Sequence, residues 1–229
     1  TRRVDMVLKN PILRNNRWTV LIIVAVVMMM GYVFWDMMSP LSTSLKAPVA
    51  QGGQGWSSAE YGFYAGSYSV FNIFFLMLFF GGIILDKFGI RLTGLMATGC
   101  MLAGAVINWY ALVNISPVDE QILTFTLFGL VPSHIKTQVL VSAFGFGLFG
   151  MGCDITGITV SKVITKWFTG HALATAMGLQ VALARLGTAT ALSFSPLIAL
   201  HMGGIKSSLF CGIIVLGIAF VLFVAYCFM

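Results

Sequence analysis

Six long apolar runs constrain the fold of this chain more than any other feature of its sequence. Each approaches or exceeds the roughly 20 residues that a helix needs to cross the hydrocarbon core of a bilayer. Only 9% of the residues are charged, whereas a soluble domain carries about 25%, so a water-soluble surface could not be covered. The sequence therefore predicts an all-α integral membrane protein with six transmembrane helices. The expected spans lie at about 18–39, 60–85, 92–114, 138–165, 172–199 and 206–229.

The distribution of lysine and arginine predicts the orientation of these spans. Most basic residues lie in the N-terminal tail or in the loops on the same side as that tail, and Lys46, Lys136 and Lys206 lie in the opposite loops. The positive-inside rule then assigns both ends of the chain to the cytoplasm. We expect a multi-pass protein with a cytoplasmic N-terminus, in the cell inner membrane if the source is bacterial. The basic residues form no patch with aromatic partners, which argues against nucleic acid as a partner.

Enzymatic, metal-binding and disulfide-based functions find no support in the sequence. A zinc protease would need HExxH, which is absent, and a serine protease would need a buried histidine. The three histidines lie instead at loops or span ends, and the cysteines sit singly within apolar runs, without metal-type spacing. We therefore expect a protein that is not an enzyme and has no cofactor and no metal. The histidines are His134, His171 and His201, and the cysteines are Cys100, Cys153, Cys211 and Cys227.

Three charged residues stand out because they lie inside the predicted spans and away from the span ends that face the basic loops: Asp36, Asp154 and Arg185. Each costs at least about 2.5 kcal/mol at the centre of a bilayer, so such residues are candidates for function. At about 1.5 Å per helical residue, Asp154 and Arg185 are each expected roughly 20 Å from the inner edge, on antiparallel spans. Their matched depth is close to the midplane, where transporters hold their substrates. Asp36 is expected nearer the outer end of the first span.

Two interpretations of Asp154 and Arg185 remain open. They could form an internal salt bridge whose role is neutralisation, or they could hold a solute in a water-filled cavity. In the second case, the Arg185 guanidinium would bind a carboxylate, and Asp154 would bind an ammonium group. Such a pair could also close when the cavity is empty.

A stripe of polar side chains follows one face of the second predicted span. It consists of Tyr61, Tyr64, Tyr68 and Asn72, at helical spacings of three or four residues. This pattern is typical either of a wet cavity wall or of a seam of interhelical hydrogen bonds. The candidate substrate-binding residues are Arg185, Asp154, Asp36, Tyr68, Asn72 and Tyr64. Small residues in the fourth span, including Gly145 and Gly150, predict close helix packing.

The turn after the second span reads GIILDKFGIR at 82–91. This string resembles the G-x-x-x-D-[RK]-x-G-x-[RK] signature of the major facilitator superfamily, which lies between the second and third helices of that fold. The resemblance implies that Asp86, Lys87 and Arg91 form an inner gate that latches the two halves of a transporter. In the same motif, Gly82 would permit close packing and Gly89 a tight turn. Lys87 or Arg91 would balance the charge of Asp86.

A narrower match is similar to the branch of that superfamily that contains the lysosomal dipeptide uniporter. It rests on Tyr68-Ser69 with Asn72, on Lys166-Trp167-Phe168-x-Gly170, and on Ala184-Arg185-Leu186-Gly187. The resemblance implies that an acidic residue in helix four, here Asp154, holds the amino end of a peptide. The arginine in helix five, here Arg185, would hold the carboxyl end. In this chain the acidic residue is Asp rather than Glu.

These resemblances imply the N-terminal six-helix half of a facilitator, built as two inverted three-helix repeats. A second six-helix half is expected beyond residue 229, and a half-size protein that pairs with a second copy is the alternative. We expect transport of a small organic solute, most simply di- or tripeptides, by alternating access. A proton-coupled organic-anion or drug transporter, and a non-transporting receptor or scaffold, are the alternatives. The expected partners are the lipid bilayer, the solute and the C-terminal half.

Overall fold

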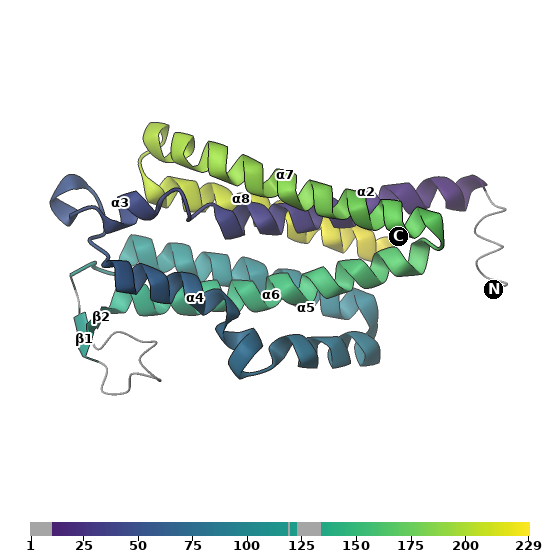
Figure 1. Ribbon diagram of the computed structural model, residues 1–229, viewed down its shortest axis with the longest axis horizontal. Coiled ribbons are helices and arrows are strands. Elements are labelled where there is room, and N and C mark those ends of the chain that lie inside the picture. The colour runs from purple at the N-terminus through teal and green to yellow at the C-terminus, as the bar shows by residue number, and fades with distance from the viewer. Residues whose placement is uncertain (1–10, 119, 123–133) are drawn as a thin grey trace.

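The computed structural model describes residues 11–118, 120–122 and 134–229, and its side chains from Arg17 onward within the first and last of these ranges. Within these ranges the chain is all-helical apart from one short hairpin (Figure 1). Five of the described helices are long and apolar enough to cross a membrane, as expected of an integral multi-pass membrane protein. The elements are α2 (Pro11–Asp36), α3 (Ser42–Lys46), the 3-10 helix η1 (Val49–Gln51), α4 (Ser58–Phe74), α5 (Met77–Asn114), β1 (Glu120–Ile122), β2 (His134–Lys136), α6 (Thr137–Trp167), α7 (His171–His201) and α8 (Ile205–Phe228).

The long helices pack as two groups. α2 packs mainly against α7 and α8, whereas α6 packs mainly against α4 and α5. In Figure 1 the first group occupies the upper part of the bundle and the second group the lower part. Contacts of α5 with α8 and of α2 with α6 join the two groups. The site described below lies where α4 and α6 of one group meet α2 of the other.

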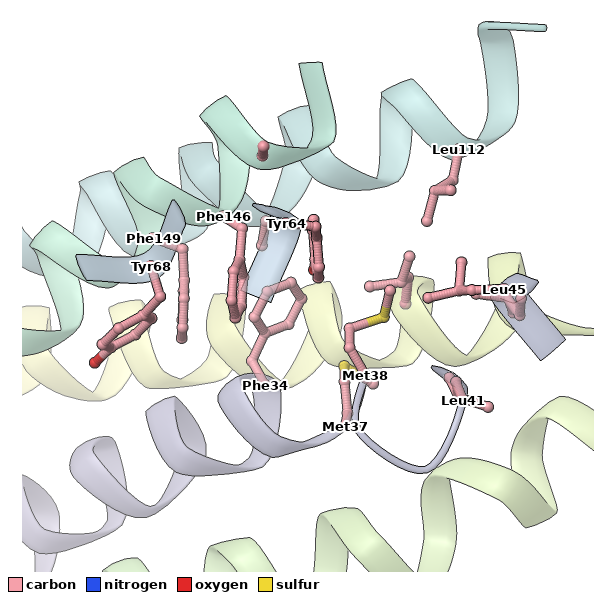
Figure 2. Close-up of a cluster of buried hydrophobic side chains, with 14 of the residues drawn as sticks. Phe34, Met37, Met38, Leu41, Leu45, Tyr64, Tyr68, Leu112, Phe146 and Phe149 are labelled. Atoms are coloured by element: carbon pink, nitrogen blue, oxygen red, sulfur yellow. The ribbon is translucent and has the colours of Figure 1, made fainter. Parts of the chain in front are cut away.

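Two clusters of buried hydrophobic side chains fill the interior. The first includes Phe34, Leu45, Tyr64 and Phe149 and lies toward the end of the bundle that carries α3 (Figures 1 and 2). The second cluster, which includes Leu21, Val160 and Phe223, lies toward the opposite end. Many large apolar side chains on the outside of the helices stay exposed, as expected for a surface that faces lipid rather than water.

The expected span at 60–85 is divided in the structure. α4 ends at Phe74, Leu76 has the left-handed φ of 50°, and α5 begins at Met77. α4 has 17 residues and so falls short of the roughly 20 needed to span a bilayer. Hydropathy gives no sign of this break, because the residues on both sides of it are apolar and neither glycine nor proline lies at the junction.

The outer loop expected at 115–137 contains a two-stranded antiparallel hairpin. Gln121 of β1 pairs with Ile135 of β2, and Ile135 is fully buried in the first cluster. The apolar stretch of this loop, expected to lie at the membrane interface, falls mostly at 123–130 and outside the described residues. The basic tail at 1–10 also lies outside them.

Candidate functional site

Asp154 of α6 is held by two donors from α4. The Tyr68 hydroxyl donates a hydrogen bond of 2.9 Å to Asp154 Oδ1, and the Asn72 side-chain amide donates to Oδ2. Tyr68 and Asn72 are four residues apart and therefore lie on one face of α4. Each carboxylate oxygen thus has one donor and keeps further acceptor capacity, on a side chain that is only partly buried.

The close approach of α4 to α6 depends on Gly150, one helical turn before Asp154. A Cβ at this position would lie 2.2 Å from the backbone oxygen of Tyr68 and 2.8 Å from its ring. No side chain tolerates the first distance, so any larger residue would force the two helices apart. Gly150 therefore sets the separation at which Tyr68 and Asn72 reach the carboxylate.

Aromatic contacts fix the Tyr68 ring in this position. Trp35 of α2 stacks on it, with ring centroids 4.5 Å apart and planes 5° apart. Phe146 and Phe149 of α6 lie at 5.7 Å and 6.2 Å (Figure 2). Tyr32, one turn before Trp35, lies 5.2 Å from the Trp35 ring. The site therefore has an aromatic wall supplied by α2 and α4.

Arg185 of α7 is exposed and, in the part of the chain that the structure describes, makes no ion pair with Asp154 or any other residue. Arg185, Asp154 and Asp36 are all near enough to Tyr32 of α2 for their charges to influence its hydroxyl group. α7 approaches α2 closely nearby, since a Cβ at Gly187 would lie 2.4 Å from the backbone oxygen of Met29. The salt-bridge interpretation of Asp154 and Arg185 therefore does not describe this conformation.

Tyr64, also expected in the site, lies in the core. It is 1% exposed, its hydroxyl accepts a 2.7 Å hydrogen bond from the Asn108 amide of α5, and its ring stacks on Phe146 at 4.7 Å (Figure 2). Together with the bonds of Tyr68 and Asn72 to Asp154, this contact makes the polar stripe of α4 a seam of interhelical hydrogen bonds. That is the second of the two interpretations that the sequence leaves open.

The 82–91 turn has a different charge partner from the one expected. Gly89, with φ 83° and ψ 174°, interrupts α5, so the chain turns where the motif predicts a turn. Asp86 pairs with Lys162 of α6 at 2.5 Å, and not with Lys87 or Arg91. Close packing also occurs one residue earlier than expected. A Cβ at Gly82 would meet nothing within 4 Å, whereas one at Gly81 would lie 2.7 Å from the Ile155 side chain.

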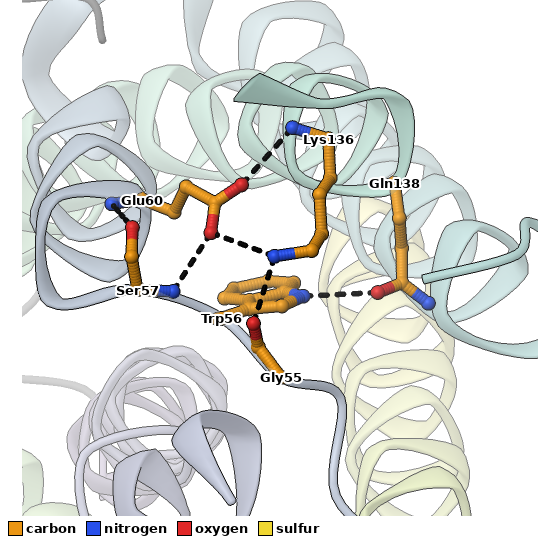
Figure 3. A network of polar contacts seen from close by, with 6 residues as sticks. All are labelled: Gly55, Trp56, Ser57, Glu60, Lys136 and Gln138. Carbon is orange, nitrogen blue, oxygen red and sulfur yellow. Dashed lines mark hydrogen bonds and ion pairs between the residues drawn. The ribbon is translucent and has the colours of Figure 1, made fainter. Parts of the chain in front are cut away.

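A buried polar network at the α3 end of the bundle was not expected from the sequence (Figure 3). Ser57 and Glu60 form a capping box at the start of α4. Glu60 also accepts from the backbone N–H of Lys136 at 3.0 Å and from its ammonium at 3.1 Å. Trp56 donates to Gln138 at 2.9 Å. The Ser-x-x-Glu pattern at 57–60 was the available signal, because it is typical of a helix start.

Comparison with known proteins identifies no family whose model matches this chain, and no curated protein matches its sequence. The resemblance to the major facilitator superfamily therefore rests on the motifs given above.

Proposed function

We propose that this chain is the N-terminal six-helix half of a major facilitator transporter. The transporter would move a small organic solute by alternating access, and di- or tripeptides are the substrates that we favour. One observation carries the proposal: opposite charges inside the predicted spans, Asp154 and Arg185, lie around the same tyrosine without pairing to each other. Unpaired charges inside a membrane are costly, and a ligand of complementary charge compensates for that cost.

A peptide backbone complements these two charges. Arg185 presents a planar fork of donors that matches a carboxylate. Asp154 retains acceptor capacity after its bonds to Tyr68 and Asn72, and an ammonium group is the donor-rich partner that such a carboxylate binds. The aromatic rings beside Asp154 lower the local polarity and so strengthen the attraction between its carboxylate and an ammonium group.

Alternating access requires a second helical bundle, and the 82–91 turn supplies the contact point that we propose for it. Asp86 is 80% exposed and Lys162 39% exposed in their ion pair, so the carboxylate remains accessible to a partner. In the proposed arrangement α4 and the first part of α5 together make the second of six crossings. The N-terminus would be cytoplasmic, and Asp86, Lys87 and Arg91 would form the inner gate.

The test is uptake of radiolabelled dialanine by the full-length protein in proteoliposomes. Arg185→Ala and Asp154→Asn should each abolish most of the uptake, because each removes one of the two charges that bind the peptide ends. Lys206→Gln, at the exposed start of α8, is the matched control and should transport normally. Unchanged uptake in Arg185→Ala would contradict the proposal.

Repeating the measurement at several pH values separates uniport from the proton-coupled alternative. In that alternative Asp154 carries a proton, so uptake should follow a pH gradient. Uptake that is indifferent to pH would exclude it. A protein that binds dialanine but moves none across the membrane would favour the receptor alternative.

A further inference from the structure

Asp36 occupies a position that attracts positive charge. It is the last residue of α2, whose final turn contains no basic residue. The C-terminal end of a helix carries about half a negative charge, so a carboxylate there adds to the negative potential instead of balancing it. Within the described residues the Asp36 side chain forms no hydrogen bond and no ion pair. It is also partly exposed and therefore accessible to a ligand.

Two aromatic side chains lie beside this carboxylate on α2. Tyr32 is four residues before Asp36 and so lies on the same face of the helix, and Trp35 reaches this face through its contact with Tyr32. The two rings are 5.2 Å apart, and both residues are partly exposed. Aromatic faces attract ammonium and guanidinium groups through the ring quadrupole, most strongly where water is excluded. A carboxylate next to such rings is an arrangement suited to an organic cation.

The charge balance of the whole site points the same way. The charged side chains well inside the predicted spans are two carboxylates, Asp36 and Asp154, and one guanidinium, Arg185, which leaves one negative charge in excess. A dipeptide with a neutral side chain brings one ammonium and one carboxylate. These would pair with Asp154 and Arg185 under the proposed function and leave Asp36 uncompensated. A substrate with one more positive group would neutralise the site.

We propose that Tyr32, Trp35 and Asp36 form a subsite for a second cationic group of the substrate, so that the protein prefers peptides with a basic side chain. This inference rests on the proposed function for the binding of the peptide ends. It adds a selectivity that the binding of the peptide ends does not itself require, because the subsite belongs to α2 and the end-binding charges belong to α6 and α7.

Binding of three dipeptides to the full-length protein tests this subsite. Affinities for Ala-Lys, Ala-Ala and Ala-Glu would be measured by isothermal calorimetry in detergent at constant ionic strength. Ala-Lys should bind about tenfold more tightly than Ala-Ala, and Ala-Glu should bind more weakly than both. Asp36→Asn, which keeps the shape of the side chain, should reduce Ala-Lys to the affinity of Ala-Ala and leave Ala-Ala unchanged.

A second variant and a different ligand keep the test decisive. Asp36→Lys should reverse the order, so that Ala-Glu binds better than Ala-Lys, and Lys206→Gln, at the exposed start of α8, should alter neither affinity. Equal affinity of the protein for Ala-Lys and Ala-Ala, or a lysine preference that survives in Asp36→Asn, would overturn the subsite. If no dipeptide binds at all, the proposed function fails. Binding of the diamine cadaverine then tests the subsite on its own. Its binding, lost in Asp36→Asn, would support the subsite, and its failure to bind would overturn it.

Discussion

Removing the Glu60 carboxylate should destabilise the protein far more than removing any exposed charge. Glu60 accepts hydrogen bonds from the Ser57 backbone at 2.7 Å and from the backbone and ammonium of Lys136 at 3.0 Å and 3.1 Å. The side chains of the ion pair are 14% exposed for Lys136 and 5% for Glu60. Glu60→Ala would leave a nearly buried ammonium whose remaining partner is the Gly55 carbonyl. Removing one partner of a buried ion pair lowers the free energy of unfolding by about 3–5 kcal/mol.

The second ion pair in the described ranges is the matched control. Asp86 and Lys162 are 80% and 39% exposed, and exposed pairs contribute about 0–1 kcal/mol. Asp86→Ala should therefore change the free energy of unfolding by less than about 1 kcal/mol, even though Asp86 belongs to the proposed inner gate.

The assay is denaturant unfolding in mixed micelles, followed by tryptophan fluorescence. The double variant Glu60→Ala with Lys136→Met should recover part of the loss, because it no longer leaves a charge buried without its partner. If Glu60→Ala and Asp86→Ala cost the same, or if the double variant is less stable than Glu60→Ala, then burial of the pair does not determine its contribution.

Three further substitutions, two of them with a matched control variant, test the packing. Gly150→Ala should abolish dialanine binding by moving α4 away from Asp154, whereas Gly157→Ala, which would meet only a flexible methionine end at 3.4 Å, should bind normally in the same calorimetric titration. Gly89→Ala should lower the free energy of unfolding by about 1–2 kcal/mol because Gly89 has a positive φ, and so should lower the thermal midpoint. Gly82→Ala should leave the thermal midpoint unchanged or raise it. Equal thermal midpoints of the two variants would contradict this reasoning. Trp56→Phe should cost about 1–3 kcal/mol, since it leaves a buried glutamine oxygen without its donor; a neutral result would show that water replaces the indole.

Hydropathy was sufficient to predict the helical membrane class, and charge made Asp154 a candidate site residue. A carboxylate inside an apolar run is conspicuous, and helical spacing placed Tyr68 and Asn72 on one face. The partners of these groups were harder to predict, because they depend on which helices pack together. Asn72 is 82 residues from Asp154 and donates to it, while Tyr64 on the same stripe turns to Asn108 of another helix. Spacing along one helix does not distinguish these two outcomes.

The break at Phe75 and Leu76 and the Glu60–Lys136 pair escaped prediction for different physical reasons. A backbone turn between apolar residues leaves no trace in hydropathy, because the apolar pattern continues across it. Lys136 was counted as a loop charge that reports orientation, and its buried state depends on a hairpin that brings it to the start of α4. Likewise, Lys162 lies near the end of the predicted span 138–165, and the sequence alone does not show that it reaches Asp86.

The bundle is divided into two helix groups, and the two opposite charges belong to different groups. Asp154 is fastened to α4 by two hydrogen bonds, whereas Arg185 belongs to α7, which packs on α2. A solute bound to both charges would hold the two helix groups at a fixed separation, and its dissociation would allow them to move relative to each other. Spin labels on α4 and α7 would then report whether solute is bound. The distribution of distances between the labels should be narrow with bound solute and broad without it.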